Sequence, residues 1–526
     1  MTRTGDVVTQ SAKDNLPDSN QQAAGSVWLV GAGPGDPGLI TVRGIEVLAQ
    51  ADLVLYDGLV NPLLLRHTKA VCERTARARR DGSAIVPQEE INRRLVEEAR
   101  AGRKVVRLKG GDPYIFGRGS EEAAALEAAG IPFEVVPGIT AAAGAGEYAG
   151  FSYTHRDISS AVAFVTGHED PTRSPGRLDY AALARFPGTL VFYMGLSRLK
   201  EICSQLICHG MASATPAAVV CQATLPSQKV LDGTLASLPD KAEESGLRPP
   251  SLIVVGECVT QREHLTWFEK LPLFGQSIGI TRPEEQADTV ADQIVRMGGE
   301  PVMMPMIEIQ PVDNAQSSVI RAALQRLSEF DWIIWTSVNG VDEFFRHLNA
   351  AGLDSRALGR SRLAVIGSST ADRLRNYGLI ADLVPDQFRA EALADGLAPH
   401  VNGRKVLWAR ASRGRDVLPD RLARAGAHVE QLVVYQNRDC DTLNADVLHR
   451  IQAGTLHWVG LSSPSIARQF SVLLTNAGID VATMSTKVAT ISPVTSEAAR
   501  AAGLVVHAEA KKYTWPGLLQ AMCFSK

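Results

Sequence analysis

VWLVGAGPGDPG (27–38) joins an apolar strand to a glycine-rich turn, and the segment after it, TVRGIEVLAQ (41–50), has the periodicity of an amphipathic helix. The same order of strand and turn returns in DLVLYD (52–57) and in VVRLKGGDP (105–113), which follows the helix-like EEINRRLVEEARAG (89–102). Alternation of this kind predicts an α/β protein with parallel sheets covered by helices.

The glycine-rich turn satisfies the G-x-G-x-x-G spacing of dinucleotide-binding loops through Gly33, Gly35 and Gly38. However, Pro34 and Pro37 lie inside that loop, and each lacks the N–H group with which such a loop holds a pyrophosphate. A dinucleotide-dependent oxidoreductase is therefore an alternative that the chemistry of the loop opposes.

A second glycine loop, KGGDPYIFGRGSEE (109–122), follows a strand and adds the carboxylate of Asp112. S-adenosylmethionine carries a sulfonium, an ammonium and ribose hydroxyls but no phosphate. Carbonyls and an acid therefore suit it better than N–H donors do. The two loops point to a methyl donor as cofactor, although Gly-Asp-Pro also forms plain turns.

Composition excludes several classes of protein. The 526 residues are 45% hydrophobic and 21% charged, which is ample apolar material for several folded domains. A formal net charge of −3 gives no basic field for nucleic acid or an anionic membrane. The seven cysteines form no C-x-x-C pair, and His155 and His168 have no further ligand at metal-binding spacing, so no metal is expected. Apolar runs such as SLIVV (251–255) are too short to cross a membrane, and we expect a cytoplasmic protein.

The α/β pattern breaks at TWFEKLPLFGQ (266–276), where aromatic residues and a proline precede a fresh strand. We place the main domain boundary there. The predicted segments are a flexible polar tail at 1–25, a first domain at 26–270, a linker at 271–276 and a second domain at 277–526.

The second domain repeats the order of strand, turn and helix, which predicts two Rossmann-like lobes. Its expected strands are SIGITR (277–282), PVMMPMIEI (301–309), DWIIWTS (331–337), RLAVIGS (362–368), KVLWARA (405–411), HVEQLVVYQ (428–436), HWVGLSS (457–463) and KVATIS (487–492). Four turns that follow strands carry Ser or Thr: WTSVNG (335–340), IGSSTA (366–371), LSSPSIA (461–467) and ISPVTSEA (491–498). Such hydroxyls cap helices, and the N–H groups beside them also bind carboxylates, so plain caps and a cleft for a polyanion are both open.

Eight motifs occur in order over residues 27–268. They are GAGPGDPG (31–38), LYDGLV (55–60), VPQEEIN (86–92), VVRLKGGDPYIFGRG (105–119), VPGITAA (136–142), THRD (154–157), VTGH (165–168) and VFYMG (191–195). Together they resemble the uroporphyrinogen-III C-methyltransferases. The resemblance implies two α/β lobes with S-adenosylmethionine between them, in a fold distinct from the common Rossmann methyltransferases. The implied cofactor site comprises Pro34, Gly110, Gly111, Asp112, Ile115, Thr140, Ala141, Met194 and Ala223.

The same resemblance implies that uroporphyrinogen III is methylated at C2 and C7 to give precorrin-2, with Asp57 as general acid/base. Without the resemblance, Asp57 is a strand-end residue that caps the next helix. Two positions depart from the family, because Gly58 stands where it usually has Arg and Arg79 where it has Lys. Arginine keeps the positive charge but is a weaker acid than lysine. We place Arg79 among the catalytic residues and expect Arg118 to bind substrate carboxylates.

Residues 277–526 resemble the uroporphyrinogen-III synthases. The motifs that carry this resemblance are ITRP (280–283), WTSVNGV (335–341), VIGSSTA (365–371), VVYQ (433–436), LSSPS (461–465) and ISPVTSEA (491–498). The resemblance implies a chain that crosses between lobes, with lobe one from 277–311 and 437–526 and lobe two from 312–436.

A synthase of this family removes hydroxide from hydroxymethylbilane and closes the ring with inversion of ring D. The resemblance implies that Tyr435 assists this loss and that Thr370 and Thr495 line the substrate cleft. Without it, the tyrosine is a core residue at a strand end and the threonines are helix caps.

The two halves together predict a bifunctional enzyme of tetrapyrrole synthesis, on a route toward products such as sirohaem or cobalamin, in which one half supplies the substrate of the other. The expected partners are small tetrapyrroles, without nucleic acid or membrane, and a second copy of the chain, because methyltransferases of this family are commonly dimers. Two further alternatives remain, a decayed or regulatory second half and a methylase that acts on a later precorrin.

Overall fold

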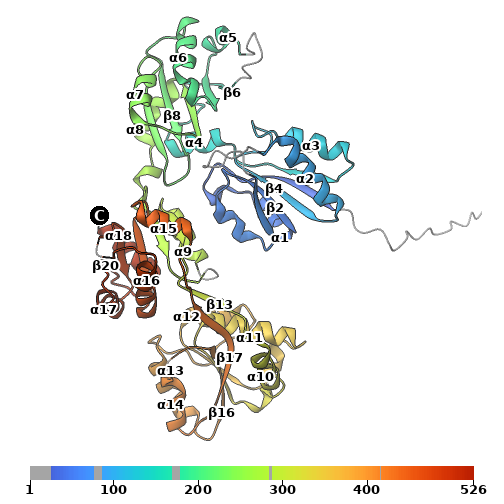
Figure 1. Cartoon of the computed structure of the whole chain (residues 1–526), viewed down its shortest axis with the longest axis vertical. Coiled ribbons are helices and arrows are strands. Elements are labelled where there is room, and N and C mark those ends of the chain that lie inside the picture. Colours follow the sequence, from blue (N-terminus) through green and yellow to red (C-terminus); the bar gives the residue numbers. More distant parts are fainter. Residues whose placement is uncertain are drawn as a thin grey trace, which may run out of the picture. The chain divides into compact units, whose positions relative to one another are not determined.

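The computed structural model describes residues 25–75, 86–168, 178–283, 287–414, 416–481 and 483–525. The chain forms two compact units. Unit 1 comprises Met1–Gln276 and Val295–Glu300, and unit 2 comprises Ser277–Ile294 and Pro301–Lys526. Each unit contains two five-stranded sheets with helices packed against them (Figure 1), so the predicted α/β class is confirmed.

The first sheet of unit 1 is entirely parallel, as predicted. In spatial order its strands are β3 (Val71–Thr75), β2 (Leu53–Asp57), β4 (Lys104–Lys109), β1 (Ser26–Gly31) and β5 (Phe133–Val136). The helices of this part are α1 (Val42–Gln50), α2 (Gln88–Arg100) and α3 (Gly119–Ala128). Apolar clusters cover both faces, because alternate strand residues such as Val105 and Val106 point to opposite sides and are both fully buried.

The second sheet of unit 1 is mixed, so the expectation of parallel strands is wrong there. Its order is β6 (Val162–Thr166), β7 (Thr189–Tyr193), β10 (Ser251–Val255), β8 (Pro216–Cys221) and β9 (Lys229–Thr234). Strand β10 runs antiparallel to both neighbours, and β8 and β9 form an antiparallel pair. The connection at 222–228 is too short for the crossover that a parallel pair needs. The helices are α4 (Ala141–Ala149), α5 (Tyr180–Ala184), α6 (Leu199–Cys208), α7 (Leu238–Ser245) and α8 (Arg262–Leu265).

One sheet of unit 2 combines strands from both ends of its sequence. Its order is β12 (Glu300–Met303), β11 (Ser277–Ile280), β18 (Trp458–Leu461), β19 (Lys487–Thr490) and β20 (Val506–Glu509). The accompanying helices are α9 (Asp288–Arg296), α15 (Ala445–Gln452), α16 (Pro464–Asn476), α17 (Pro493–Ala501) and α18 (Trp515–Phe524). The chain therefore leaves this sheet after β12 and returns to it at β18, which is the crossing that the resemblance implied.

The other sheet of unit 2 is formed by the intervening residues. Its order is β13 (Ile307–Gln310), β17 (His428–Asp439), β16 (Lys405–Ala411), β14 (Trp332–Trp335) and β15 (Arg362–Val365). The helices are α10 (Asn314–Leu324), α11 (Val338–Ala350), α12 (Ser368–Arg375), α13 (Ala390–Leu397) and α14 (Val417–Arg424). All pairs are parallel except β13 with β17.

Two details of unit 2 differ from the predicted strands. The run at 301–309 is split into β12 and β13, because Pro305 lies between them and cannot donate to a sheet. Strand β13 pairs with the end of β17, so residues 307–310 belong to the sheet of the intervening residues, although the boundary at 311 placed them with lobe one. Strand β20, with the short sequence VHAE, was not predicted at all.

The segment at 271–276 forms backbone hydrogen bonds rather than an extended connector. The N–H of Leu273 donates to the carbonyl of Met297, and the N–H of Glu300 donates to the carbonyl of Gln276. Both segments belong to unit 1. Leu273 is buried, so the residues of the predicted linker are part of a folded structure.

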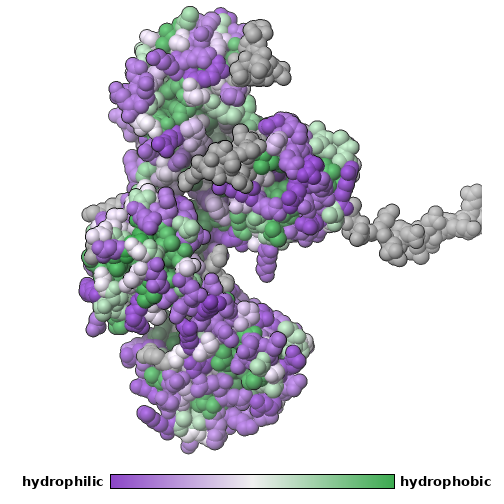
Figure 2. Space-filling view, in the orientation of Figure 1, coloured by the Kyte–Doolittle hydropathy of each residue, from purple (hydrophilic) through white to green (hydrophobic). Residues whose placement is uncertain are grey.

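The outer surface is mostly hydrophilic on the face seen in Figure 2, with scattered apolar residues among the charged ones. Among the described residues, no helix has both the length and the apolar character that crossing a bilayer requires.

Candidate functional site

The loop that ends β1 is joined to the loop that ends β4. Gly33 and Gly111 exchange backbone hydrogen bonds of 3.2 and 2.7 Å, and Ala32 N–H donates to the carbonyl of Lys109. Gly33 and Gly111 have φ angles of 76° and 72°, in the region that glycine adopts without steric cost. The N–H groups of Ala32 and Gly33 are thus engaged within the protein and are not offered to a pyrophosphate, which opposes the dinucleotide alternative.

Asp36 connects the same loop to the second lobe of unit 1. Its N–H donates to the hydroxyl of Thr224 at 2.9 Å, and its carboxylate accepts from the hydroxyl of Tyr148 at 2.8 Å and from Gly38 N–H at 2.8 Å. Burial raises the pKa of Tyr148, and the charge of Asp36 raises it further, so the hydroxyl remains a donor at neutral pH. Tyr148 and Thr224 could not be predicted from the sequence, because nothing in their local patterns marks them.

The predicted cofactor residue Asp112 uses its carboxylate to hold two loops. One oxygen accepts from the N–H groups of Tyr114 and Ile115 at 2.8 and 3.1 Å, and the other accepts from Gly138 N–H at 3.0 Å. These bonds tie the loop after β4 to the loop after β5. Asp112 therefore holds the shape of these two loops, and both of its carboxylate oxygens already accept hydrogen bonds from them.

Strained backbone gathers around the same loops. The described non-glycine residues with positive φ are Phe116, Arg118, Met194, Gln222 and Thr224, and they all lie in unit 1 after β4, β7 or β8. One of them is a predicted cofactor residue, Met194, and two of them flank another, Ala223. Backbone strain of this kind costs free energy and persists where the surrounding structure enforces it, often at ligand sites.

Tyr193, at the end of β7, connects three of these segments. Its hydroxyl lies 2.6 Å from the hydroxyl of Thr140 and accepts from Ala142 N–H at 3.0 Å. Its ring lies 4.7 Å from the ring of Phe116, measured between centroids. Burial raises the pKa of Tyr193. This tyrosine was also missed by the sequence analysis, although VFYMG was among the motifs.

The predicted cofactor residues lie in two groups. One group comprises the joined loops and the start of α4, and the other comprises the residues that follow β7 and β8. Pro34, Gly110, Gly111, Asp112 and Ile115 lie in the joined loops after β1 and β4. Thr140 and Ala141 begin α4, whose Gly144 lies so close to Pro34 that an added Cβ would come within 2.6 Å of it. Met194 and Ala223 follow β7 and β8, and Met194 is 51% exposed.

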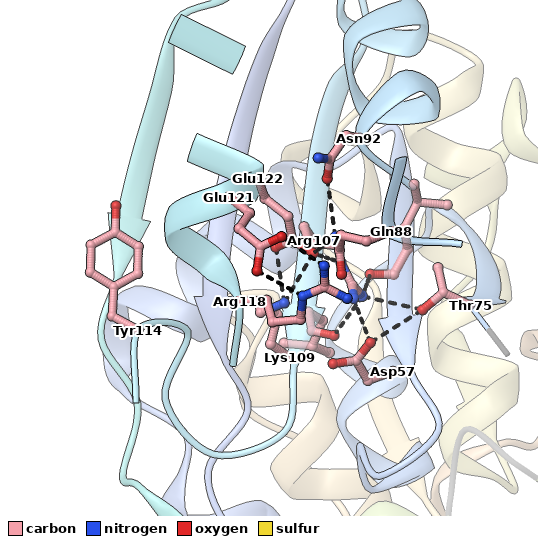
Figure 3. A network of polar contacts seen from close by, with 12 residues as sticks. Asp57, Thr75, Gln88, Asn92, Arg107, Lys109, Tyr114, Arg118, Glu121 and Glu122 are labelled. Atoms are coloured by element: carbon pink, nitrogen blue, oxygen red, sulfur yellow. Dashed lines mark hydrogen bonds and ion pairs between the residues drawn. The ribbon is translucent and has the colours of Figure 1, made fainter. Parts of the chain in front are cut away.

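A network of charged side chains surrounds Asp57 at the end of β2 (Figure 3). Arg107 on β4 donates to Asp57 through Nη2 at 2.5 Å and to Glu122 on α3 through Nε at 3.0 Å. Lys109, also on β4, lies 2.9 Å from Glu122 Oε2. The hydroxyl of Thr75 donates to Asp57 at 3.2 Å. Asp57 was predicted as a site residue from the sequence, whereas none of these partners was.

Burial and charge act in opposite directions on the two cations. Burial disfavours the charge of Arg107, but Asp57 and Glu122 more than compensate, and its pKa is raised. Burial, with a smaller contribution from the neighbouring Arg107, lowers the pKa of Lys109. Of the two cations, Arg107 therefore holds its positive charge over the wider pH range.

Of the two arginines predicted for this site, the structure describes Arg118. Arg118 lies on the surface, where it forms a bidentate ion pair with Glu121 at 2.7 and 2.8 Å. Arg79 lies outside the described residues. At the departure Gly58, an added Cβ would come within 2.9 Å of Arg74, whose guanidinium donates to the carbonyl of Gly58.

In unit 2, Tyr435 lies within β17 rather than at its end, at the last residue that pairs with β16. Its hydroxyl is 3.0 Å from the hydroxyl of Ser337. Ser337 caps α11 by accepting from Gly340 N–H at 2.9 Å. Burial raises the pKa of Tyr435, so its phenol is protonated at neutral pH. The pair lies at the carboxyl edge of parallel strands, where ligands of α/β sheets bind.

The predicted threonines are buried in the first turns of two helices. Thr370 lies in α12, after β15, and Thr495 lies in α17, where its hydroxyl is 3.1 Å from that of the cap Ser492. Ser337, Ser463 and Ser492 cap three of the four turns identified in the sequence, and Gly367 occupies the fourth cap position. The described contacts do not join Tyr435 to either threonine.

Groups of three or more histidine, cysteine or carboxylate side chains suited to a metal ion are absent from the part of the chain that the structure describes.

Comparisons with known proteins agree with this architecture. The family model for tetrapyrrole (corrin/porphyrin) methylases matches residues 26–239, and the model for uroporphyrinogen-III synthase HemD matches residues 288–520. The porphyrin biosynthesis protein HemD of Ruminiclostridium josui is 39% identical over 449 residues, which is 85% of this chain and 88% of that protein. The uroporphyrinogen-III C-methyltransferase of Bacillus subtilis (strain 168) is 38% identical over 69% of this chain and 74% of its own length.

Other similarities are partial. The siroheme synthase of Pseudomonas fluorescens (strain Pf0-1) is 53% identical over 47% of this chain, and the match spans 52% of that protein. A structure of the uroporphyrin-III C-methyltransferase of Thermus thermophilus with S-adenosyl homocysteine has 38% identity, covers 45% of this chain and 99% of its own, and gives a TM-score of 0.39. A structure of a mutant uroporphyrinogen III synthase from the same organism has 16% sequence identity. It covers 48% of this chain and 98% of its own, with a TM-score of 0.34.

The two family models match successive parts of the chain, and one relative matches across both. The chain therefore belongs to the tetrapyrrole-biosynthesis proteins that join a uroporphyrinogen-III methyltransferase to a uroporphyrinogen-III synthase.

Proposed function

We propose that unit 1 methylates uroporphyrinogen III at C2 and C7 with S-adenosylmethionine to give precorrin-2, and that unit 2 makes uroporphyrinogen III from hydroxymethylbilane with inversion of ring D. The observation that best supports the methyl donor is the loop at 31–38. Its amides at Ala32, Gly33, Asp36 and Gly38 bond within the protein, which suits a cofactor without phosphate.

The residues that would hold S-adenosylmethionine are those of the two groups described above. The cofactor supplies a methyl group on a positively charged sulfonium. Met194 and Ile115 present exposed apolar side chains, which exclude water, and the carbonyls of the joined loops suit its ammonium and hydroxyls. The bonds of Tyr193 to Thr140 and of Asp36 to Tyr148 fix these loops before binding, so orientation contributes most to the rate.

We assign to Asp57 the removal of a proton from the methylated macrocycle. Its side chain is 20% exposed, while Arg107 behind it is fully buried and holds one carboxylate oxygen. An ionised carboxylate in this position accepts a proton. It also stabilises the positive charge that the macrocycle gains on methylation. Arg118 and Arg79 would pair with substrate carboxylates, for which Arg118 must leave Glu121.

In unit 2 we assign to Tyr435 the donation of a proton to the departing hydroxide of hydroxymethylbilane. Ser337 orients its hydroxyl. Thr370, Thr495 and the capped helix N-termini would hold the substrate carboxylates.

The domain boundaries at 26–270 and 277–526 are part of the proposal, as is a homodimer through unit 1. The lobe limits expected at 277–311, 312–436 and 437–526 are moved so that β13 and the whole of β17 belong to the lobe of the intervening residues. Val162 and Phe164 on the edge strand β6 are exposed apolar residues that favour such contact. Light scattering would show a mass of two chains. We also place the enzyme in the cytoplasm, where seven free cysteines are stable.

The test of the methylation assignment supplies uroporphyrinogen III and S-adenosylmethionine anaerobically to the full chain and to Asp57→Asn. The native chain should give a dimethylated product by mass spectrometry, and the variant should be slower by a factor of about 100 or more. The cyclisation rate of the same preparation is the control, because Asp57 belongs to the other unit. An unchanged methylation rate would remove Asp57 from the mechanism.

A further inference from the structure

Four charged side chains of unit 1 alternate in sign along one chain of contacts: Asp57, Arg107, Glu122 and Lys109 (Figure 3). Arg107, Glu122 and Lys109 have side-chain exposures of 0%, 0% and 1%, whereas Asp57 is 20% exposed. Two cations and two anions cancel when every member is ionised. We call these four side chains the charge ladder. When all four are ionised the ladder has zero net charge, and Asp57 is its most exposed member.

The arrangement follows from the sheet register. Leu55 of β2 lies opposite Arg107 of β4, so Asp57 and Leu55 share a sheet face with Arg107 and Lys109. Glu122, in the first turn of α3, lies between the two cations, and Gln88 on α2 also donates to it at 3.1 Å. Glu122 is thereby held by three buried donors from β4 and α2.

Other described charges near Asp57 are more exposed or engaged elsewhere. From β3, Thr75 is a neutral donor, and Arg74 donates to the carbonyl of Gly58. Arg118 pairs with Glu121 on the surface. Because Arg107, Glu122 and Lys109 are buried, a charge added or removed at Glu122 or Lys109 acts on Asp57 with little screening.

We propose that Lys109 and Glu122 are positioning residues that act through Arg107 to set the proton affinity of Asp57, and so fix the lowest pH at which unit 1 methylates its substrate. This inference rests on the proposed function of Asp57. The sign is defined, because protonating Asp57 leaves one uncompensated positive charge in the ladder. A more positive ladder keeps Asp57 ionised to lower pH, and a more negative ladder allows it to protonate at higher pH.

The experiment measures single-turnover methylation of uroporphyrinogen III against pH in the full chain, with Lys109→Met, Glu122→Gln and the double variant. The acid limb is the pH range in which the methylation rate falls as the pH is lowered. Lys109→Met makes the ladder negative and should move this limb to higher pH by about one unit or more. Glu122→Gln makes it positive and should move the limb downward. The double variant restores neutrality and should return the limb to the native position. Ionisation of the substrate is common to all proteins and cancels in the comparison.

Affinity for S-adenosylhomocysteine, measured by calorimetry, shows whether each variant retains a folded unit 1. Shifts of opposite sign with recovery in the double variant support the inference. Unmoved limbs, or shifts of the same sign, in variants that bind S-adenosylhomocysteine normally would overturn it. If Glu122→Gln does not fold, Lys109→Met and the double variant decide the outcome.

Asp57→Asn separates the two claims. If it loses methylation while the limbs of the other variants do not move, the ladder inference fails and the proposed function stands. If it methylates at the native rate with the native pH profile, the proposed function fails and the inference falls with it.

Discussion

Asp36 connects three segments of unit 1 through its backbone N–H and its carboxylate. Its partners are Gly38 in its own loop, Tyr148 on α4 and Thr224 after β8. The glycines and prolines around Asp36 are readable in the sequence as a tight turn. The bonds to Tyr148 and Thr224 are not readable, because the partners lie far along the chain and become neighbours only in the folded unit.

Tyr148→Phe tests this contact. The variant removes one hydrogen bond and leaves Asp36 short of a donor, so unit 1 should lose about 1 kcal/mol of stability. Affinity for S-adenosylhomocysteine should fall about fivefold if the loop loosens by the same free energy. Thermal unfolding and calorimetry provide the measurements, with the exposed Tyr513→Phe as control. Unchanged affinity would show that the bond does not shape the cofactor site.

Tyr435→Phe tests the proton donor of unit 2. Cyclisation of hydroxymethylbilane should slow by about tenfold or more, because the phenol is lost while the ring remains. Methylation of added uroporphyrinogen III should be unchanged. Tyr377→Phe is the matched control, since it removes a hydroxyl bonded to Asp342 in the same lobe. Equal losses in the two variants would indicate damage to packing instead of chemistry.

The pKa of Tyr435 also predicts a pH profile. Burial raises this pKa above its ordinary value near 10, so the phenol keeps its proton at every pH up to about 10. The associated stability is complete below pH 10 and is lost as the pH rises through the folded-state value. Native cyclisation should therefore show no decline attributable to this tyrosine before about pH 10. A fall near neutral pH that disappears in Tyr435→Phe would contradict the assignment.

At the scale of elements, strand and helix order was predictable and pairing direction was less so. The apolar runs at 27–31 and 105–108 became β1 and β4 in a parallel sheet because each is followed by a helix. The run around 251–255 is equally apolar, yet it became the antiparallel β10. Hydrophobic periodicity indicates which residues are buried. The direction of strand pairing depends instead on the edge of the sheet at which the chain re-enters it. Pro305 similarly splits a run whose apolar pattern is continuous.

The serine turns of unit 2 are helix caps in the structure, and Ser463 offers a clean test. Its hydroxyl accepts from Ile466 N–H at 3.2 Å at the start of α16. Ser463→Ala should destabilise the helix end by about 1 kcal/mol, so amide hydrogen exchange in the first turn should be about fivefold faster. Ser465→Ala in the same turn is the control, because its hydroxyl bonds to Ser463 and not to a backbone amide. Identical exchange in the two variants would argue against capping.

At the scale of the whole molecule, the sequence predicted a change of fold near residue 272, and the compact units divide at Gln276. It did not predict that Val295–Glu300 belongs with unit 1, because the bonds of Leu273 to Met297 and of Gln276 to Glu300 join residues with no shared motif. The candidate site shows the same limit. Most predicted cofactor residues gather at the ends of strands, whereas the residues that connect them were not found.

A separated first half, residues 1–276, tests the independence of the units. It should bind S-adenosylhomocysteine with native affinity, because the described contacts of the cofactor loops lie within it. It should unfold at a lower temperature than unit 1 of the full chain, because Leu273 and Gln276 lose their partners. A half that binds weakly would show that the second unit supports the methyltransferase site.

The central claim is that one chain performs two successive reactions of tetrapyrrole synthesis. The direct test is an anaerobic incubation of the full chain with hydroxymethylbilane, with and without S-adenosylmethionine. Chromatography and mass spectrometry identify the products. Without the methyl donor, the product should be uroporphyrinogen III. With it, the product should be the dimethylated macrocycle. Formation of the type I isomer alone would contradict the synthase half, and an unmethylated type III product in the presence of the donor would contradict the methyltransferase half.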